Sequence, residues 1–374
     1  MKPDYDVVVA GLGVMGSAIL LELARRGHRV LGVDARRPPH TAGSSHGRTR
    51  IIREAYFENP LYVPLVRRAY DGWRRLESAT GRSLMRVTGG LNIGPQDGML
   101  VQGTLASVRT HQIAHESMTA DEIRRRFPGL APQPSDVGVF EANAGMLFAE
   151  ECVRAQLDGA AGEGATLRLE EELLDWRADG DGAWMITAHG THHAGAIVLA
   201  LGAWLAPLLA PAGVPLTVER QTHHWFAAGG ELRAERCPVM LWEYEPLGVF
   251  WAVPDIGHGL KAGIHHDGAI TASPDEIDRT VRADDEQRVR ALLDTRIPAT
   301  GRSLGAEVCL YTNTPDRGFI IDRHPSHENV VIASACSGHG FKFAPVLAEV
   351  AADLVTGRTT DSGAFGLARF GPAR

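Results

Sequence analysis

The start of the chain alternates apolar and polar stretches in a way that predicts a strand, a helix and a second strand. Residues 7–10 form an apolar run, and residues 15–26 carry apolar side chains at helical spacing. A second apolar run covers residues 30–33 and ends at Asp34. Short buried strands joined by a helix are typical of a parallel βαβ unit, so the chain is expected to open with an α/β domain.

The same periodicities predict further helices and strands through the first half of the chain. Helices are expected at residues 61–77, 99–110, 120–127 and 149–161. Strands are expected at residues 87–93, 166–169 and 196–201, with a hairpin at residues 184–188 and 191–193. Residues 38–50 begin with two prolines and are rich in Gly, Ser, Thr and His, so they are predicted to form a loop.

The pattern changes in the second half. Four short aromatic and β-branched segments, THHWFAA, VMLWEY, GVFWAV and GLKAGI, lie between residues 218 and 264 and predict an antiparallel sheet. A charged helix is expected at residues 273–294, with Ser273 as its cap. Buried strands at residues 319–322 and 330–334, and a helix at residues 345–356, then return to the pattern of the first domain.

Together these patterns predict the α/β fold class with two domains. One is a Rossmann-like, nucleotide-binding domain formed by residues 1–85, 145–214 and 310–374. The other is an α+β substrate domain built on the antiparallel sheet, formed by residues 86–144 and 215–309. The nucleotide-binding domain is therefore expected to be discontinuous, with the antiparallel parts lying over it as a lid.

The segment GLGVMG joins the first strand to the first helix and contains three glycines at the spacing of a dinucleotide-binding turn. The first glycine permits a tight turn, the second lets the backbone approach a pyrophosphate, and the third lets helix and strand pack closely. Unpaired N–H groups at the helix N-terminus attract phosphate, and an acid ending the second strand can bind ribose hydroxyls. The predicted cofactor contacts are Gly11, Gly13, Val14, Met15, Gly16 and Asp34. This motif alone leaves NAD and FAD open.

Composition narrows the possible functions. Of 374 residues, 44% are hydrophobic and 22% charged, which is ordinary for a globular enzyme. The formal net charge of −7 provides no excess of cations for phosphates, so no nucleic-acid partner is expected. No apolar run is long enough for a membrane span, and no signal peptide is recognised. Four widely spaced cysteines without a CxxC motif favour a reducing, cytoplasmic location.

Two residue types invite other chemistry. Histidines occur in three adjacent pairs, at His192/His193, His223/His224 and His265/His266. Neighbours on a strand point to opposite faces, and no HExxH motif or carboxylate partner accompanies a pair, so no metal is expected. Three of the cysteines are expected to pack as small apolar side chains, namely Cys152, Cys237 and Cys336.

Three polar regions, taken together, resemble one family of flavoenzymes. They are SSHGRTRIIREAY (44–56), GLKAGIHH (259–266), and CLYTNTPDRGFIIDRHP (309–325) with CSGHGFKF (336–343). Their order and spacing resemble monomeric sarcosine oxidase and N-methyltryptophan oxidase, FAD enzymes of the glycine-oxidase and D-amino-acid-oxidase superfamily. The resemblance runs from Tyr5 to about Phe370, and it implies a monomer that uses FAD, a small amine and dioxygen. In that family a cysteine binds the flavin 8α-methyl covalently, and the matching cysteine is Cys309.

The resemblance also implies roles for single residues. Arg53 and Lys342 match a clamp for the substrate carboxylate, in which the arginine offers a planar fork and the lysine a point charge. Lys261 matches a lysine near flavin N5 that promotes the oxygen reaction. Arg50 matches an arginine at the flavin face, where positive charge favours the reduced flavin. His265 matches a histidine over the substrate. The residues implied to wall the substrate are Tyr56, Trp251 and Tyr311, and Tyr311 is grouped with Arg50, Lys261 and His265 as catalytic.

Further cofactor contacts are expected from three segments. The loop before Arg50 contributes Ser44, Ser45 and His46. Gly202 and Trp204 follow a buried strand and resemble the second backbone approach to the nucleotide in flavoenzymes, although an ordinary strand-to-helix turn explains them nearly as well. A glycine-rich loop before the last helix is again an anion site, and its expected contacts are Gly338, His339, Gly340 and Lys342.

The predicted function is oxidation of secondary amines, foremost N-methyl amino acids, with dioxygen reduced to hydrogen peroxide. Three positions depart from the family pattern. Arg48 replaces an acid, Glu54 a histidine and Cys336 an aromatic residue, and the first two are expected to alter the substrate pocket. One alternative is a cyclic or bulkier imino acid, such as a pipecolate-like ring. Two others are an NAD-linked dehydrogenase that uses only the first motif and a flavin-binding protein without turnover.

Overall fold

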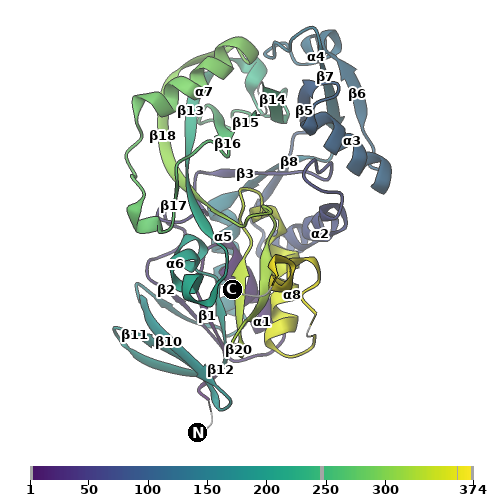
Figure 1. Cartoon of the computed structure of the whole chain (residues 1–374). Helices are drawn as coiled ribbons and strands as arrows, with labels where there is room; N and C mark the ends of the chain where they lie inside the picture. The colour runs from purple at the N-terminus through teal and green to yellow at the C-terminus, as the bar shows by residue number, and fades with distance from the viewer. Residues whose placement is uncertain (1–2, 245–247, 360, 372–374) are drawn as a thin grey trace.

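Strands from both ends of the chain and from its middle share one sheet. The computed structural model describes residues 3–244, 248–359 and 361–371 (Figure 1). Within these ranges the eight strands of this sheet are β1 (Tyr5–Ala10), β2 (Val30–Asp34), β9 (Thr166–Leu169), β10 (Leu173–Asp179), β11 (Gly182–Thr187), β12 (Gly190–Leu199), β19 (Ile320–His324) and β20 (His327–Ser334). β1 pairs in parallel with β2 and β12, and β12 pairs in parallel with β20. The expected Rossmann-like sheet is confirmed.

Alternating apolar residues explain why β1 is central. Val7 and Val9 pack into one core cluster and Val8 and Ala10 into another, because successive side chains point to opposite faces of the sheet. Helix α1 (Val14–Arg25) covers the first face, between α5 (Ala149–Gly162) and α8 (Ala344–Val355). Each fully buried valine contributes about 1.5–3 kcal/mol of hydrophobic free energy. This core fixes the place where the glycine turn leaves β1.

A second, largely antiparallel sheet lies above the first in the view of Figure 1. Within the described residues it contains nine strands: β5 (Gly90–Pro95), β6 (Glu116–Thr119), β7 (Asp136–Glu141), β13 (Thr217–Ala228), β14 (Val239–Tyr244), β15 (Gly248–Val253), β16 (Leu260–His265), β17 (Ile270–Thr271) and β18 (Thr300–Asn313). The remaining α-helices in the described part of the chain are α2 (Tyr62–Thr80), α3 (Met99–His111), α4 (Ala120–Arg126), α6 (Leu205–Leu209) and α7 (Ala283–Arg296). The mixed α/β class with a second antiparallel sheet is therefore confirmed.

A small sheet lies between the two large ones in Figure 1 and corrects two predictions. It consists of β3 (Thr49–Ile52), β4 (Met85–Val87) and β8 (Gly145–Phe148). β3 begins inside the stretch that was expected to be a loop. The strand predicted at residues 87–93 is broken at Gly89, whose φ of 76° lies in the left-handed region, so β4 and β5 belong to different sheets.

Other element predictions were wrong in their bounds. The helix expected at residues 273–294 begins only at Ala283, because the Asp285 carboxylate accepts the Arg282 N–H and caps α7 there. Ser273 instead caps a single 3₁₀ turn, Pro274–Glu276. The second hairpin strand and the strand at residues 196–201 are one continuous strand, β12. The long strand β18 was not predicted, because its first half, TGRSLGAE, has no apolar alternation.

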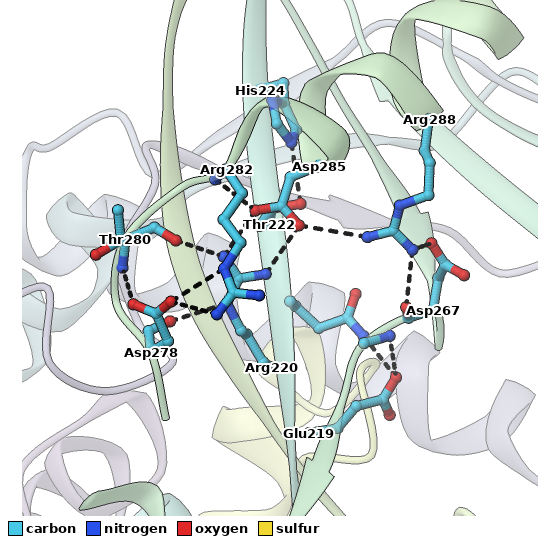
Figure 2. A network of polar contacts seen from close by, with 12 residues as sticks. Glu219, Arg220, Thr222, His224, Asp267, Asp278, Thr280, Arg282, Asp285 and Arg288 are labelled. Atoms are coloured by element: carbon cyan, nitrogen blue, oxygen red, sulfur yellow. Dashed lines mark hydrogen bonds and ion pairs between the residues drawn. The ribbon is translucent and has the colours of Figure 1, made fainter. Parts of the chain in front are cut away.

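Strand β13 has two different faces, and this positions the functional site. Even-numbered side chains point toward α7: Arg220 donates two hydrogen bonds to the Asp285 carboxylate, at 2.9 and 2.7 Å (Figure 2). Odd-numbered residues lie opposite Cys309 and Tyr311 of β18, because Gln221 pairs with Cys309 and Glu219 with Tyr311. Helix α7 therefore packs against the even-numbered face of β13, and the odd-numbered face of the strand is left to contribute to the functional site. No helix in the described ranges is long and apolar enough to cross a membrane.

Candidate active site

A cavity extends from the glycine turn after β1 to the odd-numbered face of β13 and its neighbouring strands. Most of the predicted site residues line it: Gly11, Gly13, Val14, Met15, Asp34, Ser44, Ser45, Arg50, Arg53, Gly202, Trp204, Trp251, Lys261, His265, Cys309, Tyr311, Gly338, His339, Gly340 and Lys342. Three predicted residues, Gly16, His46 and Tyr56, are absent from this lining. The structure therefore brings together residues that are more than 300 positions apart in the chain.

The nucleotide end of the cavity is built on backbone that leaves no room for side chains. Gly11 has a φ of 84°, and a Cβ on it would lie 2.6 Å from the Ala200 carbonyl oxygen. A Cβ on Gly16 would lie 1.7 Å from the Gly11 oxygen, so Gly16 packs α1 against the turn and does not face the cavity. The Asp34 carboxylate accepts the Leu12 N–H at 2.7 Å and ties the turn to β2. This glycine cradle at a helix N-terminus fits the ADP half of FAD.

Two further segments close around this end. Ser45 Oγ accepts the Val14 N–H at 3.0 Å, which fastens the loop before β3 to the first turn of α1. Gly202 has a φ of 57°, and a Cβ on it would meet no atom within 4 Å, so its backbone is open toward the cavity. Gly340 is the opposite case, since a Cβ there would lie 1.8 Å from the Ala335 oxygen. The last glycine loop is therefore compact and carries its cavity-facing residues in fixed positions.

Cys309 lies in a basic environment. Its side chain is 1% exposed, Arg50 Nη2 donates to its sulfur at 3.8 Å, and His46 lies beside it. Burial raises the pKa of the Cys309 thiol, but the His46 hydrogen bond and the charges of Arg50 and His46 outweigh it, so that the pKa is about 7. His46 Nδ1 lies 3.0 Å from Glu307 Oε2. Burial lowers the His46 pKa, but the hydrogen bonds with Cys309 and Glu307 outweigh burial and raise it to about 9. The Cys309 side chain is therefore partly present as the thiolate near neutral pH.

Lys261 is buried at the middle of the cavity. Its side chain is 3% exposed, and its Nζ donates to the Thr49 carbonyl at 3.0 Å. The ammonium also lies 5.3 Å from the centre of the Trp251 ring. Burial, followed by the charge of Arg50, lowers the Lys261 pKa well below its usual range. Arg50 is held by donation to the carbonyls of Thr49 and Ser44, at 2.8 and 2.7 Å.

Arg53 and Lys342 meet at the inner end of the cavity, together with a carboxylate. Arg53 is 4% exposed and donates to both oxygens of Glu58, at 2.9 and 2.8 Å. Lys342 Nζ donates to the His339 carbonyl at 2.8 Å, and burial lowers its pKa to about 7. Both cations face space where an anion could bind, but Glu58 now occupies the fork of Arg53.

His265 and Tyr311 form the opposite wall. His265 Nδ1 lies 3.2 Å from the Tyr311 hydroxyl, and burial lowers the His265 pKa well below its usual range. A Cβ on Gly338 would lie 2.6 Å from both rings, so the glycine loop packs directly against them. A neutral imidazole held in this way can accept a hydrogen bond or a proton from a ligand amine.

The structure places several predicted residues differently from expectation. Tyr56 is fully buried behind the clamp, where its hydroxyl lies 2.7 Å from His339 Nδ1, so it does not wall the cavity. Arg48 and Glu54 do not line the cavity either: Arg48 is exposed, and Glu54 pairs with Arg67 at 2.8 Å. The two departures therefore lie outside the cavity lining, and their effect on the substrate pocket stays a prediction. Cys336, expected to be a core packer, does line the cavity.

Two titratable side chains beside the predicted catalytic residues, Glu58 and His223, are among the cavity residues that the sequence reasoning missed. Glu58 follows Arg53 by five residues in irregular backbone, where no periodicity relates them. His223 was considered only as half of a histidine pair, and the prediction that the pair splits between two faces is confirmed: His223 lines the cavity, whereas His224 lies 2.9 Å from Thr222 on the α7 side. The signal that could have identified His223 is the alternation of side chains along β13, in which odd-numbered residues share a face with Cys309 of the neighbouring strand β18.

The model of the FAD dependent oxidoreductase family, DAO, matches residues 6–354. The chain belongs to this family. It is 42% identical to a monomeric sarcosine oxidase of Streptomyces avermitilis, over 96% of each chain, and 34% identical to an N-methyl-L-tryptophan oxidase of Yersinia pestis, over 98% of this chain and all of that one. The structure of NikD, an amino acid oxidase essential for nikkomycin biosynthesis, superposes with a TM-score of 0.85 at 25% identity, covering 97% of this chain and 96% of that one.

The chain is therefore an FAD-dependent oxidase of the sarcosine oxidase type, acting on CH–NH donors. The family uses FAD, so the NAD-linked alternative is dropped. The glycine cradle described above fits the nucleotide half of such a cofactor. Cys309, Arg50 and Lys261 line the same cavity and are the candidates to contact the flavin half.

Proposed function

We propose that this enzyme oxidises secondary amines that carry a carboxylate, foremost N-methyl amino acids, to an aldehyde and the demethylated amine. The observation that carries the proposal is the pair of buried cations, Arg53 and Lys342, facing one cavity with His265. Relatives named for sarcosine and N-methyltryptophan support the same class of substrate.

The protein's own groups divide the work between binding and proton transfer. FAD, when bound, accepts a hydride from the carbon next to nitrogen and passes electrons to dioxygen. Arg53 and Lys342 bind the carboxylate once Glu58 releases the arginine fork, and this orients the amine. His265 accepts a hydrogen bond or a proton from the amine nitrogen, which must be neutral to release a hydride. Arg50 and Lys261 provide positive charge that would stabilise the negative charge formed on the reduced flavin and on dioxygen.

The test is a peroxide-coupled screen of N-methyl amino acids, cyclic imino acids and matched amines without a carboxylate. N-methyl amino acids should give the highest kcat/KM, and Arg53→Gln should lower it by about 100-fold for these acids and much less for the amines. A preference for cyclic imino acids would favour the alternative substrate class. Equal activity on amines without a carboxylate would contradict the clamp.

We also propose that the flavin is attached covalently through Cys309. The basic environment of this thiol favours the thiolate, which is the nucleophile that such a bond requires. The purified protein should stay yellow after acid precipitation, and Cys309→Ala should release the colour into the supernatant. Cys336→Ala is the matched control, because Cys336 lines the same cavity without the hydrogen bond from His46. Release of flavin from the unmodified protein would contradict the link.

A further inference from the structure

A buried histidine without an assigned role lies beside Lys261. His223 is 3% exposed, and its Nδ1 has no hydrogen-bond partner among the described residues. A Cβ on Gly47 would lie 2.7 Å from His223 Nδ1 and 3.4 Å from Lys261 Nζ, so the two nitrogens lie close together on the same side of the Gly47 backbone. Thr49 Oγ1, from the neighbouring segment, is also buried without a partner in the described chain. Unpaired buried polar atoms are costly, so His223 has hydrogen-bonding capacity that the described chain does not use.

Both side chains border the cavity and share an aromatic neighbour. His223 and Lys261 both line the cavity. The His223 ring lies 5.4 Å from the Trp251 ring, and Lys261 Nζ lies 5.3 Å from the same ring. An ammonium has three N–H donors, and the Thr49 carbonyl accepts one of them. Lys261 therefore has donors to offer toward a ligand that His223 also reaches.

The charges around His223 keep it neutral. Burial lowers the pKa of His223 well below its usual range, and the positive charge of Lys261 lowers it further. The charged and titratable groups around His223 are Lys261, Arg50, His46, Glu307 and Cys309, together with His224 on the other face of its own strand. His223 and Lys261 thus compete for a proton, and negative charge arriving in the cavity would favour uptake of one.

We propose that His223 and Lys261 together form the dioxygen site, in which His223 passes a proton to the peroxide as it forms. This assignment rests on the proposed function, in which the enzyme is an oxidase and Lys261 lies where dioxygen is reduced.

The overall reaction requires such a proton. Conversion of dioxygen to hydrogen peroxide takes up two electrons and two protons, whereas the reduced anionic flavin supplies two electrons and one proton. The other proton comes from solvent through a group in the cavity. A neutral imidazole can take a proton at one nitrogen and release one at the other. Lys261 complements it as a positive charge that stabilises the anion formed from dioxygen.

Stopped-flow mixing of the reduced holoenzyme with oxygenated buffer tests this role. His223→Asn and His223→Val should each slow flavin reoxidation by about tenfold or more at pH 7 and leave anaerobic flavin reduction by substrate within about twofold. The pH profile of reoxidation should lose one ionisation in both variants. Reoxidation as fast as in the unmodified enzyme would overturn the proposal.

A second measurement does not depend on turnover. The midpoint potential of the bound flavin is titrated against pH in the holoenzyme. Reduction places negative charge in the cavity and draws a proton onto the His223 and Lys261 pair, so the potential of the unmodified enzyme should fall more steeply with pH than that of His223→Asn. Equal slopes would overturn the proposal.

His224 provides the matched control. It is the next residue of β13 and is fully buried, but it lies on the α7 side of the strand, away from the cavity. His224→Asn should therefore leave reoxidation unchanged. Equally slow reoxidation in His224→Asn would show that disturbance of β13 causes the effect and would overturn the proposal.

Lys261→Met separates this inference from the function on which it rests. Slow reoxidation in Lys261→Met with normal reoxidation in both His223 variants would remove only His223 from the site. Normal reoxidation in Lys261→Met as well would move the oxygen reaction to another part of the cavity and contradict that part of the proposed function.

Discussion

Glu58 sets the charge that a substrate carboxylate meets in the cavity. Its carboxylate fills the fork of Arg53, and its side chain is 20% exposed. The rings of Tyr56 and Phe57 lie 4.3 and 5.0 Å from the Arg53 guanidinium and hold it in place. A carboxylate ligand must therefore displace Glu58, because the guanidinium itself has little freedom to move.

Replacing this carboxylate should strengthen the binding of acids. Glu58→Gln removes the competing negative charge, so the Kd of a simple carboxylate inhibitor should fall by about tenfold, as measured by flavin absorbance changes at pH 6. At that pH Lys342, whose pKa is about 7, carries its proton. Glu54→Gln is the control, since Glu54 pairs with Arg67 outside the cavity. Weaker binding in Glu58→Gln would show that Glu58 helps to hold the ligand.

At the scale of elements, α7 and β13 act as one unit. Arg220 on β13 is 12% exposed and its partner Asp285 on α7 is 6% exposed. Asp285 also accepts the Arg282 N–H at the start of α7 (Figure 2). Arg290 of the same helix lies 4.2 Å from the Phe226 ring of the strand. The helix therefore fixes the even-numbered face of β13, and with it the direction of the odd-numbered residues in the cavity.

Removing the Asp285 charge should destabilise the protein in a pH-dependent way. Asp285→Asn leaves Arg220 without its buried partner and should lower the free energy of unfolding by about 3 kcal/mol at pH 7. Burial raises the pKa of Asp285, but the hydrogen bonds from Arg220 and Arg282 outweigh it and lower the pKa to about 2. The contribution is therefore present above about pH 4 and is lost as the pH falls toward 2.

Urea unfolding followed by tryptophan fluorescence at several pH values measures this effect. The difference between the variant and the unmodified protein should shrink as the pH is lowered. Asp284→Asn is the control, because Asp284 is the preceding, exposed residue of α7. A difference that does not depend on pH would contradict the role of the ionised carboxylate.

For the whole molecule, local sequence patterns predicted more of the fold than of the functional site. The β1, α1 and β2 elements follow directly from apolar periodicity and glycine spacing, because each depends on neighbours close in sequence. The break at Gly89 and the extent of β18 depend on which sheet each segment joins, and no local pattern encodes that choice.

The site was predictable only where the chain resembles a family. Periodicity could not bring Lys261 to Thr49 or Arg50 to Cys309, since these contacts join distant segments. Glu58 was missed because its partner lies in irregular backbone, and His223 because its importance comes from the residues that surround it. The burial of Tyr56 likewise depends on the packing of His339 and Phe343 against its ring.

The span of the cavity along the chain sets an order of events during biosynthesis. Gly11 leaves the ribosome long before Cys309 and Lys342, which lie far along the chain and line the same cavity. A nascent chain can form the glycine turn early, yet it cannot complete the cavity until Lys342 has been made. Stable loading of FAD is therefore expected to follow synthesis of these residues, and a chain truncated before Cys309 should be released as colourless protein.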